Sequence, residues 1–144
     1  MTAQDDVKEL IKQFDLAADE LLNGNPEPVK MCFSHRQDVT LGYPLGPFAH
    51  GWEQVAAVLD HAALQVRDGE MVEAETLTSH VTPELAYLVR VERSQGKVGG
   101  QDVITPFSLR ATMIMAPEDG AWKIVHRHAD AIMTARPMES VIQQ

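Results

Sequence analysis

The chain has 144 residues, of which 44% are hydrophobic and 23% are charged, and its formal net charge is −9. This size and composition are typical of one globular domain, and the acidic balance argues against a nucleic-acid partner, because binding phosphates needs a basic surface. The sequence has neither a run of roughly 20 apolar residues nor a basic, apolar leader, so we expect no membrane partner and a cytoplasmic location.

The first half of the sequence predicts helices. Apolar residues recur at three- and four-residue steps through residues 5–22, which is the stripe of an amphipathic helix. Asn23 and Gly24 are expected to stop this helix. A second, short helix is expected to begin at Pro26, because proline is favoured in the first helical turn.

A short strand is expected next, over residues 38–41. The loop that follows contains Gly42, Pro44, Gly46 and Pro47, which allow no long regular element. A third helix is predicted over residues 51–66. We expect Asp68 and Gly69 to end it.

The second half predicts strands. Runs rich in β-forming residues cover 71–81, 85–94, 101–115 and 121–133, and turn-forming residues separate them. Short breaks favour antiparallel neighbours, and Pro106 marks a point where a bend or bulge is expected. Residues 1–144 therefore predict one α+β domain, with a curved, mostly antiparallel sheet that forms a cone packed against three N-terminal helices.

The last two predicted strands carry a recognisable pattern. An Arg-bearing strand around Arg110 is followed by an acidic-glycine turn at Asp119 and Gly120, and then by the strand segment Trp-Lys-Ile-Val-His-Arg-His over 122–128. This pattern resembles the C-terminal signature of SnoaL-like proteins of the nuclear transport factor 2-like superfamily, relatives of ketosteroid isomerase and polyketide cyclases. The calcium/calmodulin-dependent kinase association domain looks similar over the same stretch. The resemblance implies a conical pocket between sheet and helices, and a homodimer formed through the convex face of the sheet.

Two functions stay open, because this fold hosts several classes of enzyme as well as binding and assembly domains. The first is a small-molecule-binding protein, either a plain binder or a cofactor-independent isomerase, cyclase or dehydratase that transfers a proton. The second is a non-catalytic binding or oligomeric assembly domain. Neither requires a metal or an organic cofactor, and we expect none.

Arg110 is the first candidate for ligand binding. On a strand it shares one face with Thr112 and Ile114, and neither face of this segment is clearly polar, so we expect the strand to be covered on both sides. A buried arginine needs a partner. That partner is either a ligand carboxylate or enolate gripped by Arg110 and Thr112, or an ion pair with Glu92 or Asp130.

His126 and His128 are the candidate proton carriers. Their spacing predicts one shared strand face, together with Trp122, Ile124 and Asp130. An imidazole can abstract or return a proton next to a carbonyl near neutral pH. The alternatives are a hydrogen-bonded pair at a dimer interface or rim, and a zinc site, for which Asp130 on the same strand is a poor third ligand.

Asp38 is the candidate catalytic base that the resemblance suggests, with a capping or turn-forming role as its alternative. Ketosteroid isomerase pairs an aspartate base with a tyrosine and a protonated aspartate that stabilise an oxyanion. The only tyrosines in this chain are Tyr43 and Tyr87, and neither has an evident aspartate partner.

Further ligand-binding candidates lie at the expected pocket mouth and on the middle strand. Tyr43, Phe48 and Trp52 border the glycine- and proline-rich loop and can sort ligands by shape, although Trp52 can equally anchor the third helix. Glu92 shares a strand face with Arg90. Hydrophobic alternation favours an outward position for this face, whereas a sheet curled the other way carries Glu92 into the pocket.

Overall fold

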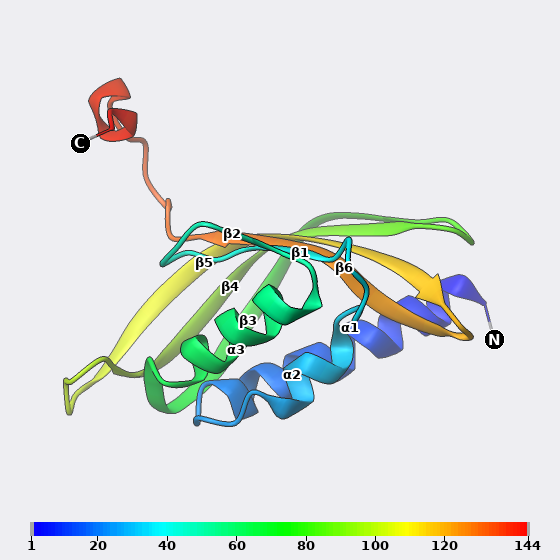
Figure 1. The fold of residues 1–144 in the computed structure, drawn as a ribbon. Coiled ribbons are helices and arrows are strands. Elements are labelled where there is room, and N and C mark those ends of the chain that lie inside the picture. The colour runs from blue at the N-terminus through cyan, green and yellow to red at the C-terminus, as the bar shows by residue number, and fades with distance from the viewer. Residues whose placement is uncertain (1, 144) are drawn as a thin grey trace.

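The computed structural model describes residues 2–143 and consists of three α-helices on one face of a six-stranded sheet (Figure 1). The predicted α+β fold class is confirmed. The elements are α1 (Ala3–Leu21), α2 (Glu27–Cys32), β1 (Thr40–Gly42), β2 (Phe48–His50), α3 (Trp52–Ala63), β3 (Val66–Val81), β4 (Ala86–Val98), β5 (Ile104–Glu118), β6 (Ala121–Asp130) and the 3-10 helix η1 (Met138–Val141).

The strands are arranged in the order β2-β1-β6-β5-β4-β3. Each neighbouring pair is antiparallel except β1 and β6, which run parallel. Strand β2 lies in the segment for which the sequence predicts only an irregular loop. It is three residues long and pairs with β1, so the glycines and prolines before it still exclude a long element.

Helix α1 begins at Ala3, two residues before the predicted start. The reason is a capping box: the Oγ1 of Thr2 accepts a hydrogen bond from the amide of Asp5, and the Asp5 carboxylate accepts one from the amide of Thr2. The apolar stripe of this helix packs on the inner face of the sheet. Gly24 has a φ of 93° just after the helix, in agreement with its expected role as a stop signal.

Strand β3 begins earlier than predicted, and Asp68 and Gly69 do not end a helix. Helix α3 has already ended at Ala63, and the two residues form a bulge in β3, where the pairing with β4 shifts between Arg67 and Glu70. Gly69 packs closely there, because a Cβ at this position would lie 2.9 Å from the Cβ of Leu22. The Asp-Gly signal thus serves a strand bulge rather than a helix stop.

Of the bend or bulge expected at Pro106, the bulge is absent. The register of β4 and β5 runs without a shift through the pair Gln95 and Pro106. Strand β6 pairs with β5 only from Arg110 onward. Pro106 therefore lies where one side of β5 has no neighbouring strand, which is the kind of position at which a sheet tolerates a residue without an N–H.

A bulge does occur between β5 and β6, and it determines which side chains of β6 face inward. Ile114 pairs with His126 and Met115 pairs with Ile124, so Val125 is an extra residue in β6. The alternation of side chains changes phase at this residue. Ile124 consequently lies in the core, while His126, His128 and Asp130 lie on the outer face. The prediction that all four share one strand face is therefore wrong.

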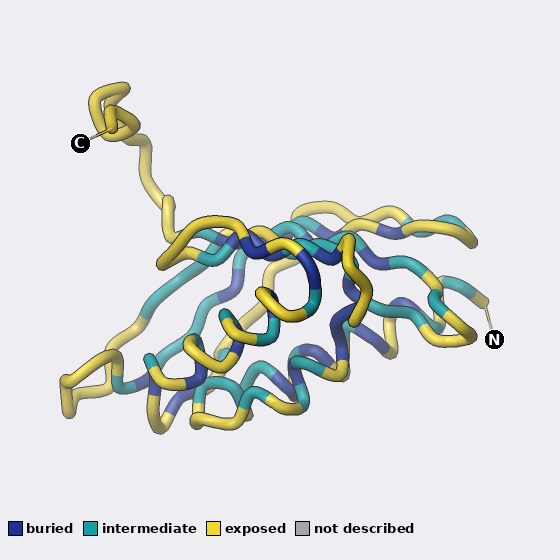
Figure 2. Tube along the Cα trace, in the orientation of Figure 1, coloured by how far each residue is buried: buried dark blue, intermediate teal, exposed yellow. Residues whose placement is uncertain are grey.

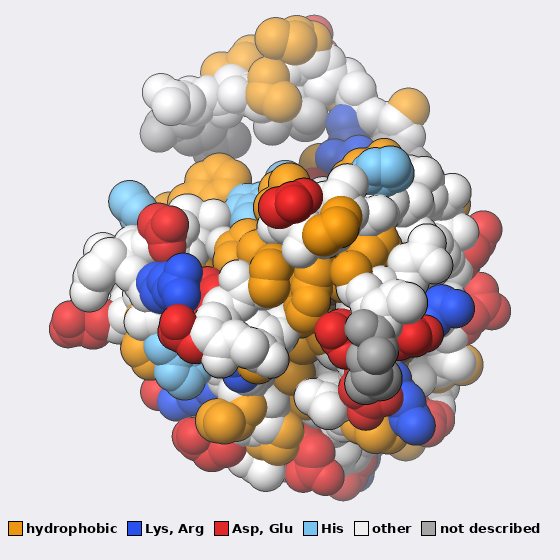
Figure 3. All heavy atoms as spheres, turned by 90° about the vertical axis from the view of Figure 1, so that its right-hand side faces the viewer, with side chains coloured by type: hydrophobic (Ala, Val, Ile, Leu, Met, Phe, Trp, Pro, Cys, Tyr) orange, Lys and Arg blue, Asp and Glu red, His pale blue; other side chains and the backbone are white. Residues whose placement is uncertain are grey.

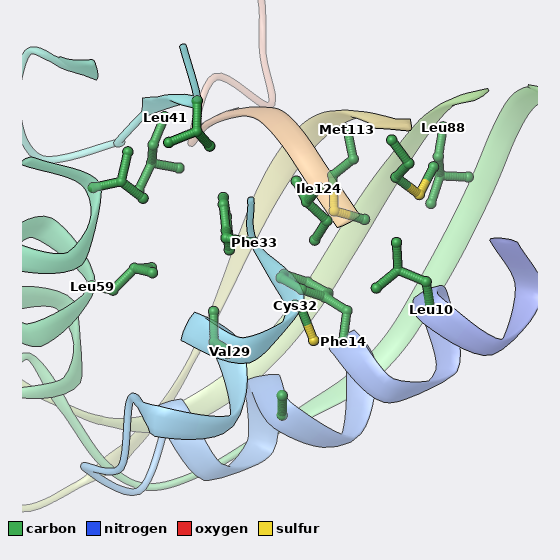
Figure 4. Packing of buried hydrophobic residues seen from close by; sticks show 14 of the residues in the cluster. Leu10, Phe14, Val29, Cys32, Phe33, Leu41, Leu59, Leu88, Met113 and Ile124 are labelled. Carbon is green, nitrogen blue, oxygen red and sulfur yellow. The ribbon is translucent and has the colours of Figure 1, made fainter. Parts of the chain in front are cut away.

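The hydrophobic core lies between the inner face of the sheet and the three helices. Side chains from α1, α2 and the strands meet there, including Phe14, Phe33, Met113 and Ile124, all at most 4% exposed (Figure 4). Buried residues occur along the helices and strands of the body, whereas the C-terminal segment is exposed (Figure 2). Residues 131–143 are exposed and project from the end of β6.

At the end of the molecule that carries the N-terminus, hydrophobic side chains form a band between charged groups, and the C-terminal segment stands apart from the body (Figure 3). No helix among the described residues is both long and apolar enough to cross a membrane.

Candidate functional site

A cavity of about 350 Å³ lies between the helices and the inner face of the sheet. This volume is at the lower end of the range of roughly 300–1,000 Å³ that is typical of ligand pockets. All three α-helices, the loop after β1 and strands β1, β3, β4, β5 and β6 contribute to its walls, which are mostly apolar. The polar or charged side chains among its lining residues are Tyr43, Gln65, Glu92, Ser94, Ser108 and Arg127.

Glu92 and Arg127 form a two-pronged ion pair in this cavity. Arg127 Nη2 donates to Glu92 Oε1 at 2.6 Å, and Arg127 Nη1 donates to Glu92 Oε2 at 2.9 Å. The Glu92 side chain is 6% exposed and that of Arg127 is 12% exposed. Two parallel N–H···O bonds to a carboxylate fix the plane of the guanidinium, so Arg127 is held rigidly.

The ion pair continues into a network of four charges. Arg90, which is 2% exposed, donates from Nε to Glu92 at 3.0 Å, and from Nη2 and Nη1 to Asp15 at 2.6 Å and 3.3 Å. The guanidinium carbons of Arg127 and Arg90 lie 4.9 Å and 5.9 Å from the centre of the Phe14 ring. The aromatic face thus adds a cation–π attraction to both arginines.

The network keeps Glu92 ionised. Burial alone would raise the pKa of Glu92, but the charges and hydrogen bonds of Arg127 and Arg90 outweigh it and lower the pKa to about 2. Burial likewise opposes the charge of Arg90, yet its hydrogen bonds and charge contacts with Asp15 and Glu92 raise its pKa. Glu92 is therefore a weak proton acceptor at neutral pH, because a good general base has a pKa near the working pH.

Tyr43 lines the cavity from the loop after β1, at the position where the sequence predicts a pocket mouth. Burial raises the pKa of its phenol, so the hydroxyl is protonated at neutral pH and can donate a hydrogen bond. The Tyr43 ring meets the ring of His61 edge-on, with 6.1 Å between the centroids.

Arg110 lies on the outer face of the sheet and is not among the residues that line the cavity. It donates to Asp130 from Nε at 2.6 Å and from Nη2 at 3.1 Å, which is one of the two ion pairs considered from the sequence. Its side chain is 55% exposed. The expectation that this strand is covered on both sides is wrong, because no helix of the described chain packs on the outer face.

His126 and His128 also lie on the outer face. His126 Nδ1 and the Oγ1 of Thr40 are 2.7 Å apart, and burial, with a smaller contribution from His128, lowers the pKa of His126. The Phe48 ring lies 6.5 Å from the ring of His126 and 5.8 Å from that of His128. Thr112 is paired with His128 across the two strands. The structure thus brings these predicted residues together, but outside the cavity.

Asp38 and Trp52 lie apart from both groups. Asp38 is exposed in the turn before β1. Trp52 begins α3, its ring stacks on that of His35 at 3.7 Å, and it packs against the core, as expected of a helix anchor. Among the described residues, no three His, Cys, Asp or Glu side chains are grouped so that they could hold a metal ion.

Glu92 faces the cavity, so the outward position that alternation favoured is wrong. The more apolar face of β4, with Tyr87 and Val91, is the outer one, and Arg90 and Glu92 point toward the helices. Arg127 and Arg90 are site residues that were not predicted from the sequence. One signal was present: Arg127 stands between two histidines, so strand alternation puts it on the face opposite to theirs.

Comparisons with solved structures identify the fold. The chain is similar to a nuclear transport factor 2-like superfamily protein from Salmonella enterica serovar Typhimurium LT2, with 16% identity, a TM-score of 0.75, and coverage of 95% of this chain and 96% of the other. It is similar to a candidate dehydratase of the same family from Streptomyces avermitilis, with 14% identity, a TM-score of 0.73, and coverage of 92% of this chain and 98% of the other.

A third similar structure is a candidate calcium/calmodulin-dependent protein kinase II association domain from Xanthomonas campestris, with 18% identity, a TM-score of 0.69, and coverage of 90% of this chain and 87% of the other. No model of a protein family matches the chain, and no curated protein matches it. The suspected resemblance is thus confirmed at the level of structure: the chain has the nuclear transport factor 2-like fold.

Proposed function

We propose that this protein binds a small, largely apolar molecule in the cavity between helices and sheet, with one oxygen atom of that molecule accepting a hydrogen bond from Arg127. The observation that carries the proposal is a rigidly held, nearly buried guanidinium in an otherwise mostly apolar cavity. Such a cavity combines apolar walls for affinity with a few placed polar groups for orientation. The similarity to a candidate dehydratase supports a function that uses this cavity.

Binding is the function that the cavity supports better than proton transfer. Glu92 is held ionised by two arginines, and the phenol of Tyr43 is held protonated, so neither titrates near neutral pH. Proton transfer by His126 or His128 stays a prediction. Proton transfer by these histidines requires a substrate on the outer face of the sheet. If Asp38 acts as the base, the substrate must bind at the turn before β1.

The test is a thermal-shift screen with uncharged aromatic ketones, alcohols and esters, using three forms of the protein. A ligand that binds only the native state stabilises it by about 2.7 kcal/mol at a hundredfold excess over its Kd. We expect a rise in Tm for the wild type and for Arg110→Gln, and a smaller rise for Arg127→Gln. The two variants lose the same group, one on the outer face and one in the cavity.

A rise that is lost in Arg110→Gln and kept in Arg127→Gln contradicts the proposal, because it moves the site to the outer face. If Arg127→Gln does not fold, Arg127→Lys keeps the positive charge beside Glu92. It loses the planar fork that directs the N–H groups, so we expect it to bind more weakly than the wild type.

A second candidate function is assembly, and the uncovered outer face of the sheet favours it. Tyr87 is 40% exposed there, Phe48 is 65% exposed, and the half-buried Val89 and Val91 lie on the same face. Several exposed apolar side chains on one uncovered face are typical of protein interfaces. The similarity to a candidate kinase association domain supports this alternative as well.

We propose that the partner on this face is a second copy of the chain. Sedimentation is expected to give a dimer for the wild type and a monomer for Val89→Glu, which places a charge in the interface. Leu64→Glu is the control, since Leu64 is 80% exposed at the end of α3, away from the sheet face, and this variant should remain a dimer. A monomeric wild type contradicts the assembly proposal.

A further inference from the structure

We infer that the cavity selects an uncharged ligand and rejects a carboxylate of the same shape, because every charge that lines it is already paired within the protein. This inference rests on the proposed function, since it concerns the ligand of the same cavity. It also runs against the first expectation for an arginine in a pocket, which is to grip an anion.

The charges of the network cancel. Asp15 and Glu92 supply two negative charges, and Arg90 and Arg127 supply two positive charges. Both oxygens of Glu92 accept from Arg127, and one of them also accepts from Arg90. Arg127 therefore has no surplus charge to offer a ligand. Glu92 and Arg127 are also the only charged residues that line the cavity in the part of the chain that the structure describes.

A ligand carboxylate would bring a second negative charge next to Glu92 in mostly apolar surroundings. Glu92 cannot relieve the repulsion by taking up a proton near neutral pH, because its two arginine partners hold its pKa at about 2. An unpaired charge in such surroundings is strongly disfavoured. A neutral oxygen creates no such repulsion.

Arg127 can still donate hydrogen bonds to a neutral oxygen. A guanidinium carries five N–H groups, and Glu92 accepts two of them. The remaining polar groups of the wall, on Tyr43, Gln65, Ser94 and Ser108, are uncharged donors or acceptors. The class of ligand that fits is a compact apolar molecule with one or two carbonyl or hydroxyl groups.

The experiment compares 2-acetylnaphthalene with 2-naphthoate, which share a ring system and differ in a ketone or a carboxylate. At pH 7, calorimetry is expected to show that the wild type binds the ketone at least tenfold more tightly. Glu92→Gln removes the negative charge and frees that of Arg127, so this variant should prefer the carboxylate. Asp15→Asn removes the same charge from the partly exposed end of the network, outside the cavity lining, and should keep the preference for the ketone.

The outcomes distinguish two claims, namely that the cavity binds a ligand and that it prefers an uncharged one. Equal affinities in the wild type, or tighter binding of the carboxylate, overturn the inference and leave the proposed binding function standing. Failure of both compounds to bind, in a wild type that also responds to no neutral compound of the screen, overturns the proposed function and this inference with it. An Asp15→Asn variant that reverses the preference as Glu92→Gln does overturns the role given to Glu92.

A second measurement needs no variant and applies if Glu92→Gln does not fold. Above the pKa of a carboxylic acid in solution, its neutral fraction rises tenfold for each unit by which the pH falls. If the cavity accepts only the neutral form, the affinity of the wild type for naphthoic acid rises about tenfold per unit between pH 7 and pH 5. The affinity for the ketone should stay constant over the same range. A constant affinity for the acid overturns the inference.

Discussion

Replacing Glu92 by glutamine should destabilise the protein by an amount that depends on pH in a defined way. The carboxylate is 6% exposed and accepts hydrogen bonds from Arg90, which is buried, and from Arg127, which is 12% exposed. The amide that replaces it keeps the shape of the side chain but leaves Arg127 without a counter-charge. Arg90 retains its contact with Asp15. The variant therefore tests the charge of Glu92 more than its packing.

The size of the effect follows from the pKa of Glu92, which is lowered from 4.5 to about 2 in the folded protein. One pKa unit corresponds to about 1.4 kcal/mol, so the ionised carboxylate contributes about 3 kcal/mol to the free energy of unfolding at pH 7. This agrees with the roughly 3–5 kcal/mol that is lost when one partner of a buried ion pair is removed.

The sign is fixed by the direction of the shift. A carboxyl group with a lowered pKa contributes its full stability above its unfolded pKa, and this stability is lost as the pH falls through its folded pKa. The difference between wild type and Glu92→Gln should therefore be constant from pH 7 to about pH 5. It should shrink to less than half of its pH 7 value at pH 3 and vanish below about pH 2.

Urea unfolding at a series of pH values, followed by the fluorescence of the two tryptophans, measures this difference. The control is Asp130→Asn, which breaks the exposed pair with Arg110 and should change stability less than Glu92→Gln at pH 7. A Glu92→Gln variant as stable as the wild type at pH 7 would contradict the stabilising role of the Glu92 charge. So would a difference that is unchanged between pH 5 and pH 3.

Gly69→Ala should lower the free energy of unfolding, measured with urea, by about 1–3 kcal/mol, because the new Cβ would lie 2.9 Å from the Cβ of Leu22. Gly100→Ala is the control and should change this free energy little, because nothing lies within 4 Å of its new Cβ. Phe14→Ala should lower the free energy of unfolding by about 3–5 kcal/mol in the same assay, because it removes core packing and the cation–π contacts of Arg90 and Arg127. His126 should titrate below the ordinary histidine value of 6.5 in an NMR pH series, and a midpoint above 6.5 contradicts its described burial.

The sequence predicted the order of the main elements because their periodicities are local. The apolar stripe of residues 5–22 and the alternating runs after residue 71 each contain their own signal. The predicted ends of the helices and strands were less accurate where the same short sequence pattern is compatible with two kinds of structure. Asp68 and Gly69 are typical of a helix end, but they form a bulge in a strand, and only the packing against Leu22 distinguishes the two.

The site was harder to predict because it depends on which face of the sheet the helices cover. In β4 the outer face carries Tyr87 and Val91, and the inner face passes from a core position at Leu88 to a cavity position at Glu92. Hydrophobic alternation alone therefore selected the wrong face. The partner of Glu92 is also 35 residues away, at Arg127, and no local pattern reports such a pairing.

Ligand binding in the cavity is tested most directly by an NMR titration with a ketone that stabilises the wild type, following the Nε–H signals of Arg127 and Arg110. A ligand in the cavity shifts the Arg127 signal, because this guanidinium lines the cavity and is held against Glu92. The Arg110 signal should stay in place, because that side chain lies on the outer face beside Asp130. A shift of the Arg110 signal with an unchanged Arg127 signal would contradict binding in the cavity and move the binding site to the outer face of the sheet.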